Sequence, residues 1–149
     1  MYHSVVNPGG SGVYGNIFFG DNTPSAIIKI ISLDKYFAEN KINPKDIKYI
    51  WIDTEGFEPQ VLIGMKNILT ENPAPIFFEF NPHLYKKSGY FDKMLEFLSG
   101  FYSHYVWVQQ TLRDKKIEVQ LIESLRNFKD VPGLLGDIFL IHELKEVAE

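Results

Sequence analysis

Acidic side chains end two consecutive predicted strands of this sequence. Asp53 closes an apolar run at residues 48–53, Glu55 follows two positions later, and Glu79 lies in the next apolar run, at residues 76–80. In open α/β sheets, ligands bind outside the carboxyl ends of the strands. If the two strands are neighbours, three carboxylates meet at one edge, where crowding shifts their pKa values and suits them to act as bases or metal ligands. We therefore predict that Asp53, Glu55 and Glu79 are catalytic.

Three further polar residues lie near this edge and are candidates for substrate binding. Glu58 stands at the start of a predicted helix, where an acid more often complements the helix dipole. Asn81 follows the strand that carries Glu79, and a turn role beside Pro82 competes evenly with a ligand contact. His83 can face the same edge, although an exposed loop histidine is the commoner outcome. No two of the four histidines are three or four residues apart, so no helical metal pair exists and no metal site is assigned.

The segment Gly10–Gly15 matches the pattern G-x-G-x-x-G letter for letter. A nucleotide fingerprint needs a firm strand before the glycines and a helix that opens within them, so that phosphate meets the helix N-terminus. Only Val5 and Val6 precede the segment, and residues 16–19 after it are typical of a strand. We therefore interpret it as a glycine-rich surface loop.

Hydrophobic patterning outlines an α/β chain after residue 25. Strands are predicted at residues 27–31, 48–53, 76–80, 102–109 and 137–142. Helices are predicted at residues 33–40, 57–71, 91–98 and 121–128. Ser32 and Ser88 are the expected caps of the first and third of these helices. The alternation indicates a layered α/β fold with a mostly parallel sheet and an antiparallel strand among the last two.

The chain reads as a single domain, with a glycine-rich loop region at residues 1–25 and an α/β core at residues 26–149. Its length of 149 residues, 45% hydrophobic content and net charge of −4 describe a globular chain rather than a disordered one. The lack of surplus positive charge argues against a nucleic-acid partner.

Other features bear on where the protein works. The sequence has no cysteine, no apolar run of membrane-spanning length and no signal-peptide pattern at its N-terminus. These features are compatible with a reducing compartment, and we expect a cytoplasmic protein that has no membrane partner.

Four consecutive segments carry a resemblance to a known family. They are Ser32–Phe37, Ile50–Glu58, Val61–Met65 and Ile76–Phe80. Together they resemble the signature of FkbM-type methyltransferases: a "TLD" helix start, then "K-I-D-V-E-G-x-E", then "V-L-x-G", then a strand that commonly carries a glutamate. The resemblance covers about residues 26–81 and is fairly specific, because its ordered elements recur at the right spacing.

The resemblance implies an S-adenosylmethionine-dependent enzyme with a Rossmann-like methyltransferase fold that methylates hydroxyl oxygens, here of a small molecule or sugar. It makes Asp53, Glu55 and Glu58 the active-edge acids, and Glu79 stands where the next strand of the family commonly carries a glutamate. It also places Asp53 close to the methyl donor as a cofactor-binding residue. Two departures from the family pattern, Trp51 in place of lysine and Phe57 in place of a small residue, suggest an altered acceptor pocket.

In the family, the glycine-rich cofactor loop and the acid that holds the ribose lie upstream of this signature. Only 25 loop-like residues precede it here, so the chain resembles the C-terminal half of such an enzyme. We therefore expect weak or no binding of the cofactor by this chain alone. We also expect self-association, because strand 48–53 would lack a neighbour and leave a sheet edge open.

Two alternatives remain. The residues Asp53-Thr54-Glu55 resemble the D-x-E of nucleases that use two metal ions, although a helix rather than an antiparallel strand is predicted to follow. The missing cofactor half also leaves open a non-catalytic remnant or interaction domain.

Overall fold

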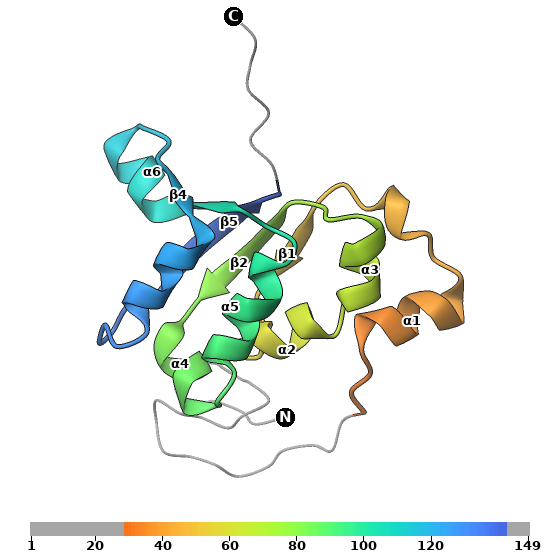
Figure 1. Ribbon diagram of the computed structural model, residues 1–149. Helices are drawn as coiled ribbons and strands as arrows, with labels where there is room; N and C mark the ends of the chain where they lie inside the picture. The colour runs from red at the N-terminus through yellow and green to blue at the C-terminus, as the bar shows by residue number, and fades with distance from the viewer. Residues whose placement is uncertain (1–28, 143–149) are drawn as a thin grey trace, which may run out of the picture.

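The computed structural model describes residues 29–142, which form a sheet of five strands with helices packed against it (Figure 1). The strands lie in the order β1-β2-β5-β3-β4. Their bounds are Ile50–Ile52 for β1, Ile76–Phe80 for β2, His104–Trp107 for β3, Val119–Leu121 for β4 and Gly136–Ile141 for β5.

The sheet is mixed, which corrects the expectation of a mostly parallel one. Only β1 and β2 pair in parallel, whereas β5 is antiparallel to both β2 and β3, and β4 is antiparallel to β3. The expected late antiparallel strand is thus confirmed as β5. Because β5 lies between β2 and β3 and opposes both, β1, β2 and β3 all point the same way. Their carboxyl ends therefore meet at one edge, together with the start of β5.

Two helical crossovers cover one face of the sheet (Figure 1). Helices α2 (Glu58–Ile63) and α3 (Lys66–Glu71) connect β1 to β2, and α4 (Pro82–Lys87) and α5 (Phe91–Ser99) connect β2 to β3. Side chains of β2 alternate between buried and half-buried, because Ile76, Phe78 and Phe80 face these helices. The core therefore lies between this face and the helices.

Helix α1 (Leu33–Asn40) forms where the sequence predicts it. The Ser32 hydroxyl accepts a hydrogen bond from the Lys35 N–H at 3.2 Å and caps the helix. The Asp34 carboxylate accepts the backbone N–H groups of Asn67 and Ile68 at 3.0 and 3.1 Å. It therefore also caps the first turn of α3 and fixes α1 against that helix.

Several predicted boundaries were wrong in the first half of the described chain. Residues 29–31, from the strand predicted at 27–31, are not a strand. Residues 27 and 28 lie outside the described residues, and so do the predicted loop at 10–15 and the predicted strand at 16–19. The helix predicted at 57–71 is divided at Gly64 and Met65 into α2 and α3. Helix α4 was missed, and Ser88 ends it rather than beginning α5.

The second half differs from prediction after Trp107. Val108 and Gln109, which were expected to prolong β3, instead begin α6 (Val108–Asp114), and β4 was not predicted. Of the helix predicted at residues 121–128, Ile122–Phe128 form the 3₁₀ helix η3, whereas Leu121 belongs to β4. A short 3₁₀ helix, η2, spans Pro44–Asp46. Over residues 29–142, none of the helices has the length and apolar character that crossing a membrane requires.

Strand β1 is an open edge of the described sheet, because its only pairing in residues 29–142 is with β2. Tyr49 and Trp51 flank this edge and are 70% and 68% exposed. An exposed apolar edge strand is a template for pairing between chains. We therefore expect the protein to self-associate, and we expect Trp51→Lys to weaken the association about tenfold or more, as measured by light scattering over a concentration series.

Leu112→Lys is the matched control, because Leu112 is 73% exposed but lies on α6 and away from β1. A chain that stays monomeric over the whole series, or two variants that associate equally, would contradict pairing through β1.

Candidate functional site

The carboxyl edge of the sheet brings two of the predicted acids together. Ile52 pairs with Phe78 in the parallel register, so Asp53 and Glu79 follow at matching positions on neighbouring strands. One carboxylate oxygen from each of Asp53, Glu58 and Glu79 lies within 4.8 Å of the other two. The predicted adjacency of Asp53 and Glu79 is confirmed, and their catalytic roles stay a prediction.

Glu58 is the structural centre of this cluster. Glu58 is fully buried, with 0% of its surface exposed. One carboxylate oxygen, Oε1, accepts the backbone N–H of Thr54 at 2.7 Å and the Thr54 hydroxyl at 2.9 Å. The other, Oε2, accepts the N–H of Gly56 at 3.0 Å. Glu58 therefore closes the turn between β1 and α2, and its burial favours this structural role over contact with a substrate.

Tyr85, on α4, ties the same carboxylate to the neighbouring strand. Its buried hydroxyl lies 3.0 Å from Glu58 Oε2 and also contacts the main-chain carbonyl of Glu79. Burial, followed by the nearby charge of Glu58, raises the pKa of Tyr85 well above its ordinary value. The hydroxyl therefore stays protonated and remains a hydrogen-bond donor.

The turn itself depends on left-handed backbone geometry. Glu55 has φ of 52° and Gly56 has φ of 94°. At this φ a residue with a side chain would be strained, and its Cβ would also lie 2.8 Å from Leu84 Cδ1, so Gly56 is the residue that suits the turn against α4. This close approach holds Asp53 and Glu55 at the edge of the sheet.

The crowded acids change one another's pKa. Burial raises the pKa of Glu79 to about 7, and the charges of Glu58, Glu55, Asp53 and Asp137 add to the effect. Burial, followed by the charges of Asp53 and Glu58, also raises the pKa of Glu55. Glu79 therefore exchanges its proton near neutral pH, which is the property of a general base or acid.

The two other predicted substrate-binding residues meet at a cavity beyond β2. Asn81 is 6% exposed, and its side-chain oxygen accepts the N–H of Leu84 at 3.2 Å, which caps α4. Exposed His83 and buried Asn81 line a cavity of about 270 Å³ with residues 132–135 of the loop before β5. Of the two roles predicted for Asn81, the structure shows the capping one. Asn81 also borders this cavity, which has room for a ligand.

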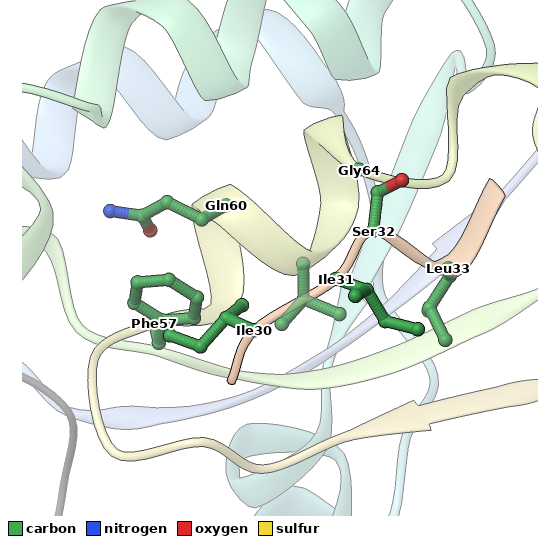
Figure 2. Close-up of a pocket in the computed structure, with 8 residues that line it drawn as sticks. Ile30, Ile31, Ser32, Leu33, Phe57, Gln60 and Gly64 are labelled. Atoms are coloured by element: carbon green, nitrogen blue, oxygen red, sulfur yellow. The ribbon is translucent and has the colours of Figure 1, made fainter. Parts of the chain in front are cut away.

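A second cavity, of about 380 Å³, lies between α2 and the segment before α1 (Figure 2). Its lining is mainly apolar and includes Ile30, Ile31, Phe57 and Val61. Phe57 and Gln60 extend to the same side of α2, away from Ser32. The buried amide of Gln60 has no hydrogen-bond partner among residues 29–142. The bulky Phe57, a departure from the family pattern, is a wall of this cavity.

Sequence reasoning missed two residues of the site. Tyr85 lies four residues after Asn81, on helix α4, which was not predicted. Its hydroxyl comes within hydrogen-bonding distance of Glu58 because of this helix. Asp137 pairs with Glu79 across the β2–β5 ladder. It begins the last predicted strand, but nothing in the sequence gives the partner of that strand. An acid at the start of a strand is the one signal that could have drawn attention to it.

A metal ion is not needed to explain the acidic cluster. The two oxygens of Glu58 already accept hydrogen bonds from Thr54, Gly56 and Tyr85. Glu55, the partner of Asp53 in the nuclease alternative, is not part of the three-oxygen cluster found among residues 29–142. The geometry therefore gives the D-x-E interpretation no support.

The α/β sheet and its acidic carboxyl edge are consistent with a methyltransferase-like fold. Residues 3–105 match the family model described as the Methyltransferase FkbM domain, which is more than half of the chain. The chain belongs to this family, which confirms the resemblance carried by its motifs, and methyl transfer is the general chemistry of the family. Neither the curated proteins nor the solved structures give a match to the sequence.

Removal of the Tyr85 hydroxyl tests the role of Glu58 as the structural centre. We expect Tyr85→Phe to lower the free energy of unfolding by about 1–3 kcal/mol, because it takes a donor away from a buried carboxylate. Urea denaturation measures this loss. Tyr36→Phe, on exposed α1, should stay within about 0.5 kcal/mol of the unaltered chain. Equal effects of the two variants would refute the role.

The raised pKa of Glu79 makes stability depend on pH in a known direction. Between about pH 4.5 and 7 the folded state binds more protons at Glu79 than the unfolded state does. The free energy of unfolding therefore falls as pH rises through this range. We expect Glu79→Gln to remove the part of this decline that Glu79 causes, while the raised pKa of Glu55 keeps its own part, and to be more stable than the unaltered chain above pH 7.

Urea denaturation at a series of pH values measures the two curves. Glu96→Gln, at an exposed position of α5, is the control and should run parallel to the unaltered chain. If the Glu79→Gln curve is also parallel, Glu79 does not have the raised pKa.

Proposed function

We propose that this chain transfers a methyl group from S-adenosylmethionine to a hydroxyl oxygen of a small molecule or sugar, with Glu79 as the base. One observation carries the proposal: Glu79 lies half-buried at the carboxyl edge, beside Asp53, with its pKa raised to about 7. A base works best when its pKa lies near the working pH.

The charge of the edge suits the proposed cofactor. When bound, S-adenosylmethionine supplies a methyl group on a positively charged sulfur. Asp53, Glu55 and Glu79 gather negative charge at one place, and such a place attracts a cation. Asp53 is the exposed member of the three, so we assign the cofactor contact to it.

The chain's own residues then handle the acceptor. As the acceptor oxygen gains the methyl group, its proton passes to the Glu79 carboxylate, which becomes neutral. Asp53 and Glu55 orient the hydroxyl, and Asn81 and His83 contact the body of the acceptor in the cavity that they line. Such a reaction depends mainly on positioning, because the methyl group is already reactive.

The experiment compares two cofactor analogues that differ in charge. Sinefungin carries a protonated amine where S-adenosylmethionine has its sulfonium, and S-adenosylhomocysteine has a neutral thioether there. We expect both to bind weakly in calorimetric titration, with dissociation constants in the high micromolar to millimolar range. Sinefungin should bind about tenfold more tightly. In the double variant Asp53→Asn, Glu79→Gln this preference should nearly vanish.

Glu39→Gln is the control, because Glu39 is an exposed acid on α1. It should leave the preference unchanged. Equal binding of the two analogues would reject the role of the acidic edge. If neither analogue binds, the proposal that this chain transfers a methyl group by itself is rejected.

A further inference from the structure

A third cavity is lined by residues of β3, α6, β4 and the loop before β5. It has a volume of about 270 Å³ and shares Leu134 and Leu135 with the cavity of Asn81 and His83. Two aromatic residues, Trp107 and Phe128, form part of its wall, with ring centroids 5.5 Å apart. The two cavities are therefore neighbours that share part of the loop before β5 as a wall.

Three glutamine amides line this cavity, and each is held by a bond to the protein. The Gln109 amide donates to Asp137 at 2.7 Å and accepts the Asp137 N–H at 2.8 Å. The Gln110 amide donates to Glu118 at 2.9 Å. These bonds fix the amides before any ligand arrives, and fixed polar groups lose little entropy on binding.

Each amide keeps hydrogen-bonding capacity, since an amide has two donor hydrogens and two acceptor sites. Gln120 lines the cavity, and its side-chain oxygen accepts the Tyr105 hydroxyl at 2.7 Å, a bond that does not use the two donor hydrogens of its nitrogen. Groups that both donate and accept match hydroxyl groups, which also do both. The partner chemistry is therefore a molecule with several hydroxyls.

Glycine keeps this wall tightly packed. A side chain at Gly136 would place its Cβ 2.9 Å from Trp107 Cζ2 and 3.0 Å from Gln109 Oε1. Both side chains thus rest on the start of β5, next to Asp137 and hence next to the strand position of Glu79. An apolar indole beside fixed amides offers one surface for ring carbons and another for hydroxyls.

The charges at the cavity argue against an anionic ligand. The Arg113 guanidinium is bound to Asp114, with its Nε 2.7 Å from the carboxylate. Glu118 and Asp137 add negative charge through the glutamines that they hold. The volume is below the roughly 300 Å³ of the smallest pockets for drug-sized ligands, so it suits a single ring.

We propose that the cavity of Trp107, Gln109, Gln110 and Gln120 binds a neutral sugar ring of the methyl acceptor. A second unit of the same glycan would occupy the neighbouring cavity of Asn81 and His83. That this sugar is the methyl acceptor rests on the proposed function. Binding of the sugar itself requires neither the cofactor nor methyl transfer.

Trp107 can report on binding directly. The chain has two tryptophans, so in Trp51→Phe the tryptophan emission, excited at wavelengths that tyrosine does not absorb, comes from Trp107 alone. The probes are methyl α-D-glucopyranoside, maltose and cellobiose, with glucuronate as the charged comparison and p-cresol as the aromatic one. We expect a saturable change of emission with the neutral sugars at millimolar concentrations, with disaccharides binding more tightly than the single ring.

Gln110→Leu in the same background should weaken sugar binding about tenfold. Gln60→Leu is the matched control, because that glutamine lies on α2, outside this cavity, and its amide has no partner in the described chain. It should leave the affinity unchanged. Side-chain amide signals of the glutamines in nuclear magnetic resonance spectra supply a second readout on the unaltered protein, which does not depend on any variant.

No emission change and no amide shift with any neutral sugar up to roughly 100 mM would overturn the proposal. Tighter binding of glucuronate or p-cresol, or equal losses in Gln110→Leu and Gln60→Leu, would also overturn it. Sugar binding without a preference between the cofactor analogues would reject the proposed function alone. A preference for sinefungin over S-adenosylhomocysteine without any sugar binding would reject this inference alone.

Discussion

The buried carboxylate of Glu58 is the interaction on which the candidate site depends. A charge out of contact with water is tolerated only when hydrogen bonds replace its hydration. Thr54, Gly56 and Tyr85 supply those bonds from the turn after β1 and from α4. The need to satisfy one carboxylate therefore holds together elements that are 27 residues apart in the chain.

This constraint has an electrostatic consequence for the neighbouring acids. The charge of Glu58 is the largest contribution after burial to the raised pKa of Glu79. Glu58 is enclosed, whereas Asp53 reaches solvent and Glu79 is half-buried. A structural acid thus tunes an acid that can meet a ligand. The close approach of these carboxylates lowers the free energy of unfolding at neutral pH. The same close approach raises the pKa of Glu79, so that this group exchanges its proton near pH 7.

Local signals predicted the parts of the fold that local interactions determine. Ser32 and the apolar spacing after it located α1, and the run Ile76–Phe80 located β2, because capping and alternation act within a few residues. The neighbouring carboxyl ends followed from strand order in α/β folds, so Asp53 and Glu79 could be paired from sequence. Helix α4 was missed, although Asn81 and Pro82 are good helix-start residues.

Other features depend on contacts that no local pattern carries. The burial of Glu58 needs Tyr85 and the close packing of Gly56 on Leu84, which appear only once α4 lies against the turn. The same is true of β4, whose three residues gain their strand form from pairing with β3. Propensity alone is a weak guide for such short segments.

The antiparallel strand β5 is what joins the acidic cluster to the glutamine cavity. By inserting between β2 and β3, it sets Asp137 opposite Glu79 and brings the loop of Leu134 and Leu135 to the carboxyl edge. Had β5 been parallel, its start and that loop would lie at the far edge. Gln109 then bonds Asp137 in two places, so the wall of the cavity and the acid beside Glu79 share one fixed geometry. A change in the loop before β5 can therefore alter the cavities while the Glu58 turn, built from β1, α2 and α4, keeps its form.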